Sequence, residues 1–174
     1  MSQALVGIIM GSDSDLSIMK ESAVIMEEFD VPYDITVLSA HRTPDLLVDY
    51  VKKANTIFKV IIAGAGGAAH LPGVIAAHTT IPVIGVPINS TPLDGIDSLY
   101  SIVQMPSGIP VATMAIGEPG ARNAGIYAIQ ILSIHYPELD KKLKEFRIKL
   151  SKSVIEKTNK LKTLGWKEYL NNKK

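Results

Sequence analysis

The sequence predicts an α/β fold, a three-layer αβα sandwich in which helices cover both faces of a central parallel sheet. Short apolar segments alternate with segments of helical periodicity, as in Ala4–Met10 followed by Leu16, Met19, Ala23 and Met26. The predicted strands are apolar on both faces, which is typical of parallel strands buried between two helical layers. With 174 residues, 47% of them hydrophobic, the chain is long enough for one domain with a buried core.

The remaining elements follow the same alternation. Further strands are expected at 33–38, 59–63, 82–86 and 110–114, and further helices from 44, at 71–78, at 94–104 and from 119. Ligand sites in open parallel sheets lie beyond the carboxyl ends of the strands. Four loops should therefore converge on one side of the sheet, those beginning at Gly11, Ser39, Gly64 and Pro87.

Residues 137–170 predict a long, lysine-rich amphipathic helix outside the α/β core of residues 1–135. Nothing in residues 1–174 supports a second domain. Its apolar stripe comprises Leu139, Leu143, Phe146, Leu150, Val154, Leu161 and Leu164. The stripe packs either on its own domain or on another subunit. Residues 124–134 are apolar nearly all round, which favours a homo-oligomer.

Charge is divided unevenly along the chain. Residues 1–140 carry 6 basic and 14 acidic side chains, a net charge of −8, whereas residues 141–174 carry 12 and 3, a net charge of +9. A solvated helix face is the first interpretation of the lysine-rich segment, and nucleic-acid binding is the alternative, although no aromatic residues interleave with the lysines. We therefore expect no nucleic-acid partner.

The sequence argues against cysteine chemistry, export and insertion into a membrane. The chain has no cysteine, which excludes disulfides, thiolate metal sites and thiol nucleophiles. The first residues show no export signal, so a cytoplasmic location is expected. The most apolar window, 60–77, is interrupted by His70, Pro72 and several glycines, and we predict no membrane span.

The segment Gly11–Asp15 (Gly-Ser-Asp-Ser-Asp) joins the first predicted strand to the first predicted helix. Backbone N–H groups and the positive end of the helix favour an anion there, and Ser12 is placed to hold a phosphate. Asp15 is assigned to sugar hydroxyls, because two acids facing a phosphate would repel it. Helix capping is the alternative reading of this segment, with Asp13 as the expected cap.

The segment Ser39–Pro44 (Ser-Ala-His-Arg-Thr-Pro) places an imidazole beside a permanent cation at the end of the second predicted strand. The guanidinium of Arg42 suits the geometry of a phosphate. Imidazoles titrate near neutral pH, so His41 could act as a general acid or base. The alternative is a surface or structural imidazole.

The glycine-rich segment 63–73 allows close approach of the backbone to a flat ligand, and we assign Gly66 and Ala68 to substrate binding. It contains a partial dinucleotide fingerprint, but Val86–Asn89 lacks the acidic residue expected at the end of the next strand. The four histidines are too scattered for a recognisable metal motif, and no metal ligand is assigned. Nucleophile-elbow and P-loop signatures are also absent from the sequence.

Taken together, the segments 11–15, 39–44 and 64–73 resemble the class I carboxyaminoimidazole ribonucleotide mutases. The resemblance continues through Pro82–Pro87 and Gly95–Pro106 and covers about residues 5–135 in the same order. It implies a flavodoxin- or Rossmann-like fold assembled as a homo-octamer. It also implies transfer of a carboxylate from the exocyclic nitrogen of a phosphorylated ribonucleotide to ring carbon 4, in purine biosynthesis and without a cofactor.

Residue roles follow from the same resemblance. Ser12, Ser39 and Arg42 should bind the 5′-phosphate and Asp15 the ribose. His41 should shuttle the proton during decarboxylation and recarboxylation. His70 is assigned to positioning the carboxylate or CO2.

Three other functions remain open at this point. A related class carboxylates aminoimidazole ribonucleotide directly with CO2 and usually has lysine where this chain has Arg42, so Arg42 favours the mutase. A non-catalytic phosphosugar-binding module would use Ser12, Asp15 and Arg42 but would not need His41. A nucleic-acid-binding protein would act through the lysine-rich segment.

Overall fold

The computed structural model describes residues 4–90 and 92–172. Within these residues, five parallel strands form one sheet in the order β2-β1-β3-β4-β5. The strands are β1 (Val6–Met10), β2 (Tyr33–Val37), β3 (Val60–Gly66), β4 (Val83–Ile88) and β5 (Ala112–Thr113). The helices are α1 (Leu16–Glu28), α2 (Pro44–Ala54), α3 (Leu71–Ala77), α4 (Ile96–Val103), α5 (Glu118–Ser133) and α6 (Pro137–Asn171).

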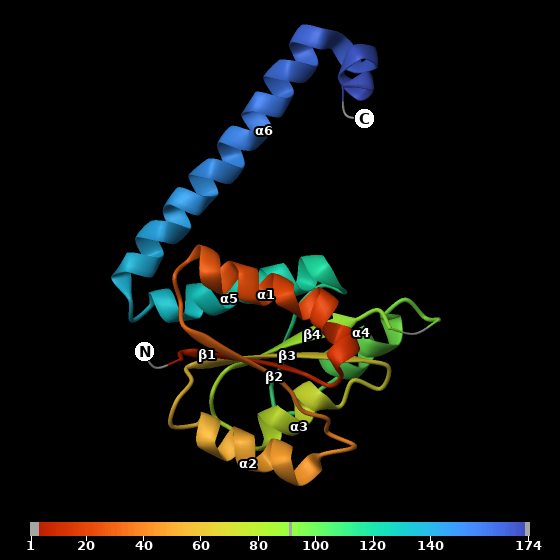
Figure 1. Cartoon of the computed structure of the whole chain (residues 1–174), viewed down its shortest axis with the longest axis vertical. Coiled ribbons are helices and arrows are strands. Elements are labelled where there is room, and N and C mark those ends of the chain that lie inside the picture. The colour runs from red at the N-terminus through yellow and green to blue at the C-terminus, as the bar shows by residue number, and fades with distance from the viewer. Residues whose placement is uncertain (1–3, 91, 173–174) are drawn as a thin grey trace.

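Helices cover both faces of the sheet, which confirms the predicted three-layer sandwich (Figure 1). One apolar cluster joins α1, α5 and the first turns of α6 to one face, and a second joins α2, α3 and α4 to the other. Neighbouring strand residues alternate between them, so that Ile8 belongs to the first cluster and Ile9 to the second. This alternation explains why the inner strands are apolar at every position.

Every strand differs somewhat in its bounds from the sequence prediction, as β3 and β5 illustrate. β3 does not stop at Ala63 but continues through Gly64 and Ala65 to Gly66, so part of the predicted glycine-rich turn is strand. A Cβ on Gly64 would lie 2.3 Å from the Met19 sulfur, which shows that this glycine allows α1 to pack closely on the sheet. β5 is limited to two residues.

Strand order positions the site. The chain passes from β1 to its neighbour β2 and then crosses back to pair β3 on the other side of β1. Such a reversal of direction places a crevice at the carboxyl ends of the strands involved. The loops that follow β1, β2 and β3 are consequently adjacent.

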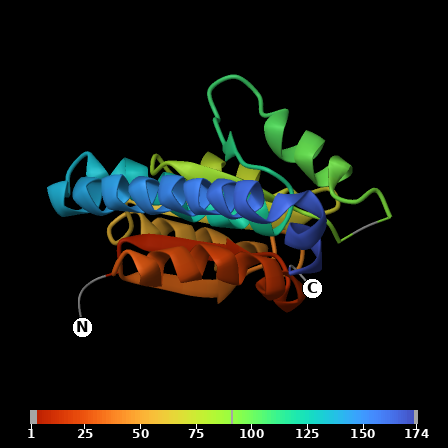
Figure 2. The same ribbon diagram turned by 90° about the horizontal axis from the view of Figure 1, so that it is seen from above.

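The C-terminal helix α6 is only partly packed on its own chain. Leu139, Leu143 and Phe146 are buried against the α1–α5 layer. Farther along the predicted stripe, Leu150, Val154 and Leu161 are 51%, 62% and 41% exposed. Figures 1 and 2 show the helix leaving the sandwich, and its backbone is non-helical at Gly165 before the last turns.

The sequence left two possible packing partners for the apolar stripe of α6, its own domain or another subunit. Only the first turns of α6 pack on their own domain. Among the residues that the structure describes, no helix is both long enough and apolar enough to cross a membrane.

Candidate active site

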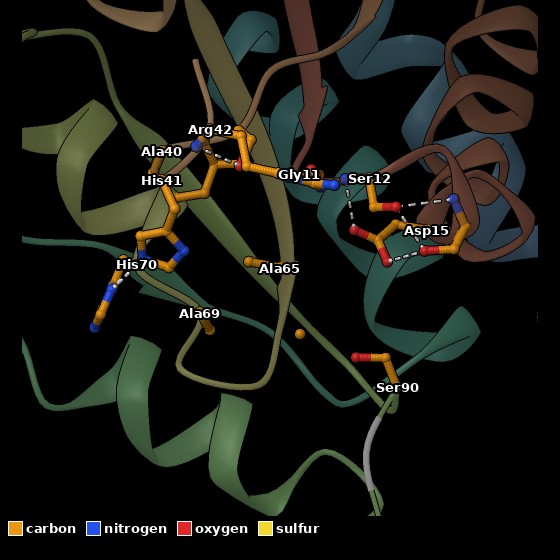
Figure 3. Close-up of a pocket in the computed structure, with 14 residues that line it drawn as sticks. Gly11, Ser12, Asp15, Ala40, His41, Arg42, Ala65, Ala69, His70 and Ser90 are labelled. Atoms are coloured by element: carbon orange, nitrogen blue, oxygen red, sulfur yellow. Dashed lines mark hydrogen bonds between the residues drawn. The ribbon is translucent and has the colours of Figure 1, made fainter. Parts of the chain in front are cut away.

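A pocket of about 220 Å³ lies at the carboxyl ends of the strands, where the loops after β1, β2, β3 and β4 meet (Figure 3). Seven of the eight residues predicted from the sequence line it, namely Ser12, Asp15, Ser39, His41, Arg42, Gly66 and His70. The eighth, Ala68, is exposed and lies outside the lining. The buried neighbour Ala69 lines the pocket instead.

The loop after β1 is held by a reciprocal capping box. The Ser12 hydroxyl accepts a hydrogen bond from the backbone N–H of Ser14 at 3.3 Å, and the Asp15 carboxylate accepts one from the backbone N–H of Ser12 at 3.2 Å. The expectation that Asp13 is the cap is wrong, because Ser12 occupies the N-cap position of the 3-10 turn Asp13–Asp15. Capping and ligand binding, the two readings of this segment, thus fall on the same residues.

Asp15 is an unusual carboxyl group because its side chain is buried at the edge of a polar pocket. Burial raises the pKa of Asp15 above the ordinary value of 3.8. The hydrogen bonds from Ser12 and Ser14 and the charge of Arg42 oppose this rise in pKa, whereas the charge of Asp13 adds to it. At the edge of the pocket, the carboxyl oxygens of Asp15 can accept hydrogen bonds from hydroxyl groups that enter it.

Arg42 ties together the loops after β1 and β2. Its Nη2 donates to the carbonyl oxygen of Gly11 at 2.9 Å, and its Nε donates to the Ser39 hydroxyl oxygen at 3.4 Å. The backbone N–H of Arg42 donates to the same hydroxyl oxygen at 3.2 Å. Because both acceptor positions of Ser39 Oγ face Arg42, its hydroxyl hydrogen is directed elsewhere and can be donated to an anion.

His41 and His70 form the closest side-chain pair in the pocket. His41 Nε2 lies 2.6 Å from His70 Nδ1, and the two rings meet edge to face with centroids 4.8 Å apart. One nitrogen must donate and the other accept, so a single hydrogen lies between the two rings. Figure 3 shows this pair on the opposite side of the pocket from Ser12 and Asp15.

The floor of the pocket is built from small residues. A Cβ on Gly66 would lie 1.9 Å from Ser90 Oγ, so only glycine leaves this part of the pocket open. Beyond Gly66 the chain turns sharply, with positive φ angles at Gly67 (62°) and Ala69 (45°). Positive φ is strained for alanine, and such strain is retained where the surrounding structure enforces it.

Ser14, Leu71 and Ser90 line the pocket but were not singled out by sequence reasoning. Ser90 lies two residues after the end of β4, and the only signal for it in the sequence was the prediction that the loop beginning at Pro87 joins the site. Among the described residues, no group of three or more acidic or histidine side chains is arranged to hold a metal ion.

Comparison with known proteins places this site in a family. The chain is 57% identical over 169 residues to N5-carboxyaminoimidazole ribonucleotide mutase from Thermotoga maritima, covering 97% of this chain and 98% of that protein. It is 60% identical over 167 residues to the enzyme of the same name from Pyrococcus horikoshii, covering 95% and 93%. Phosphoribosylaminoimidazole carboxylase from Schizosaccharomyces pombe is 57% identical over 166 residues, which are 95% of this chain but 30% of that longer protein.

The fold has solved relatives as well. The crystal structure of Treponema denticola PurE superposes with a TM-score of 0.84 at 29% identity, covering 92% of this chain and 99% of that one. The family model described as AIR carboxylase matches residues 5–153, a range that includes every strand and all the residues that line the pocket. The chain therefore belongs to the AIR carboxylase family.

Proposed function

We propose that this chain is a mutase that converts N5-carboxyaminoimidazole ribonucleotide into 4-carboxy-5-aminoimidazole ribonucleotide in purine biosynthesis. The observation that carries this proposal is the His41–His70 pair, which faces hydroxyl, carboxylate and guanidinium groups across one pocket. Relatives that match this chain along nearly their whole length bear the same activity in their names.

Substrate binding is assigned to both loops that Arg42 connects. The N–H groups of Arg42 that are not bonded to Gly11 or Ser39 are available to the 5′-phosphate, together with the hydroxyls of Ser12 and Ser39. Asp15 accepts hydrogen bonds from the ribose hydroxyls. The flat imidazole lies over the backbone at Gly66, where no side chain intervenes.

The reaction proceeds by decarboxylation followed by recarboxylation. Protonation of the exocyclic nitrogen allows its bond to the carboxylate carbon to break, which leaves aminoimidazole ribonucleotide and CO2 in the pocket. Carbon 4 of the ring then attacks CO2 and afterwards loses its proton. Confinement of both fragments makes recapture effectively intramolecular.

His41 supplies the proton in the first step and receives one in the last, so the proton count is restored after each turnover. His70 is assigned to orienting the migrating carboxylate or CO2. Substitution His41→Asn should abolish turnover while leaving ligand affinity largely intact. Unchanged turnover would remove His41 from the mechanism.

An absorbance assay without ATP tests the activity. One cuvette contains carboxyaminoimidazole ribonucleotide, and a parallel one contains aminoimidazole ribonucleotide with bicarbonate. Rapid conversion in the first alone supports the mutase. If neither substrate reacts with folded protein, the chain is better explained as a phosphosugar-binding module.

Direct carboxylation of aminoimidazole ribonucleotide is the second candidate activity, and the name of the S. pombe relative favours it. This chain spans less than a third of that relative's length, which weakens the transfer of its activity. Conversion only in the cuvette with bicarbonate would establish the carboxylase.

The proposed assembly is a cytoplasmic homo-octamer that acts without a metal or other cofactor and without nucleic-acid or membrane partners. The exposed apolar residues of α6 after Phe146 support an oligomer, because they need a partner to become buried. Charge complementarity between the basic α6 and the acidic remainder of the chain makes a second copy the natural partner.

A further inference from the structure

The hydroxyl of Thr43 closes the loop that carries His41 and Arg42. Thr43 Oγ1 accepts a hydrogen bond from the backbone N–H of Ser39 at 3.0 Å and donates one to the backbone carbonyl of Ser39 at 3.1 Å. The backbone N–H of Thr43 donates to the same carbonyl oxygen at 3.0 Å. Two of these three bonds across the five-residue loop therefore depend on one hydroxyl group.

Thr43 occupies the N-cap position of α2, where a threonine hydroxyl ordinarily accepts a hydrogen bond from the first turn of the helix. Here the side chain makes no capping bond, and α2 begins with Pro44. The hydroxyl is thus used by the loop before the helix. Loss of this hydroxyl should affect the loop more than α2.

The loop between residues 39 and 43 positions two chemically different groups. His41, near its centre, reaches His70 on the loop after β3, and Arg42 reaches Gly11 on the loop after β1. Both side chains are exposed at the pocket, so few packing contacts fix their positions. The hydrogen bonds between residues 39 and 43 must supply much of that constraint.

We propose that Thr43, which is outside the pocket lining, is a positioning residue that holds His41 against His70 and Arg42 against Gly11. This inference rests on the proposed mutase activity, because the kinetic effect is defined by that reaction. It assigns the hydroxyl to geometry of the site and not to stability of the fold.

Three variants test the assignment. Thr43→Val keeps the branched shape and removes both side-chain hydrogen bonds, and Thr43→Ser keeps the hydroxyl. Thr56→Val is the matched control, because Thr56 also bonds a backbone carbonyl, that of Lys53 at 2.9 Å, in the turn after α2 and outside the pocket.

We expect kcat/KM of Thr43→Val to fall about 10- to 100-fold, mainly in kcat, because small displacements of a catalytic group have effects of this size. The kcat/KM of Thr43→Ser should stay within about threefold of the wild-type value, and that of Thr56→Val should equal the wild-type value. Melting temperatures of the two valine variants should agree closely. Equal losses in Thr43→Val and Thr43→Ser, or no loss in either, would overturn the proposal.

A readout independent of turnover separates this inference from the proposed function. The chain has four histidines, and their ring signals in NMR spectra can be assigned by substitution. In Thr43→Val, signals of His41 and His70 should move while those of His78 and His135 stay in place.

If the wild type has no mutase activity, the proposed function fails, and the ring signals still decide the positioning role. If Thr43→Val does not fold, Thr43→Ala replaces it. Failure of both to fold would assign the hydroxyl to stability and overturn the inference.

Discussion

Gly66 is the position where added volume should affect the pocket most directly. Its missing Cβ would meet Ser90 Oγ at 1.9 Å and Ser90 Cβ at 3.1 Å. We expect Gly66→Ala to push Ser90 aside, narrow the floor and lower kcat/KM about 10- to 100-fold. Steady-state kinetics with carboxyaminoimidazole ribonucleotide measures the effect.

Ser90 provides the control for this clash. The double variant Gly66→Ala, Ser90→Ala lacks the Ser90 Oγ atom that the new Cβ would meet. It should therefore be more active than Gly66→Ala alone. Ser90→Ala alone reports any direct role of the hydroxyl. If the double variant were no better than Gly66→Ala, steric conflict with Ser90 would not explain the loss.

The raised pKa of Asp15 predicts a dependence of stability on pH. The folded chain holds this proton more tightly than the unfolded chain, whose carboxyl titrates near 3.8. Between the two pKa values the folded state binds more protons, so the contribution of Asp15 to the free energy of unfolding falls as pH rises. Asn at this position cannot titrate.

Urea unfolding of the wild type and of Asp15→Asn measures this contribution. The free energy of unfolding of the wild type relative to Asp15→Asn should fall as the pH is raised from about 3.5 to 7. A rise over the same range would mean that hydrogen bonds from Ser12 and Ser14 outweigh burial. Asp49→Asn is the matched control, because Asp49 is exposed in α2 and its charge is not among those that shift the pKa of Asp15.

Individual residues of the site were predictable where their chemistry was distinctive. His41 and Arg42 combine titratable and permanent charge at a strand end, and the structure brings both to the pocket. Ala68 and Ala69 cannot be told apart by residue type, since their exposure depends on a turn with positive φ at Ala69. Apart from its place on the loop from Pro87, Ser90 carries no signal, and its closeness to the backbone of Gly66 is set by the tertiary structure.

At the level of elements, α1 and α5 pack closely enough to require small residues. Ser22 Oγ donates to the carbonyl oxygen of Ala121 at 2.6 Å in the buried contact between them. A Cβ on Gly125 would lie 2.8 Å from Ile25 Cβ and 3.2 Å from the Ser22 carbonyl oxygen. The approach of the two helices is set by this glycine.

Gly125→Ala should therefore destabilise the chain by about 1–3 kcal/mol, the usual cost of overpacking. Gly73→Ala in α3 is the matched control, because its Cβ would meet only the flexible end of Met105 at 3.2 Å. Alanine in a helix is intrinsically favoured by about 0.5–1 kcal/mol, so Gly73→Ala should be neutral or stabilising. Thermal unfolding compares the two, and equal effects would contradict the packing argument.

Element boundaries were less predictable than element types. All five strands and the helices were expected in the correct order, because the apolar periodicities are clear. The end of β3 was missed since Gly64 and Gly66 resemble a turn, whereas in the structure they serve close packing by Met19 and Ser90. Tertiary contact, which no local pattern reports, decides such cases.

On the scale of the whole molecule, the part of α6 after Phe146 leaves apolar side chains exposed, and the proposed oligomer would bury them. Truncation after Arg147 retains the buried Leu139, Leu143 and Phe146 but removes the exposed apolar residues beyond them. We expect the truncated chain to remain folded and to be unable to form the proposed octamer. Light scattering on full-length protein should give about eight times 18.8 kDa.

A full-length chain with the mass of a monomer would contradict the proposed assembly. Salt-dependent binding of DNA by the full-length chain, absent after truncation, would instead support the nucleic-acid alternative for the lysine-rich segment. The sequence indicated the amphipathic stripe of α6, but only the three-dimensional structure shows where the chain's own core stops covering it.

The helical content of α6 between Phe146 and the break at Gly165 should depend on protein concentration, because these turns are exposed in a single chain. A single helix without tertiary contacts is marginally stable in water, because its hydrogen bonds barely offset the entropy of ordering its backbone. Beyond Phe146, α6 makes few such contacts within one chain. Its helical content should therefore rise as subunits associate and fall on dilution, so that folding of this segment becomes a measure of subunit association.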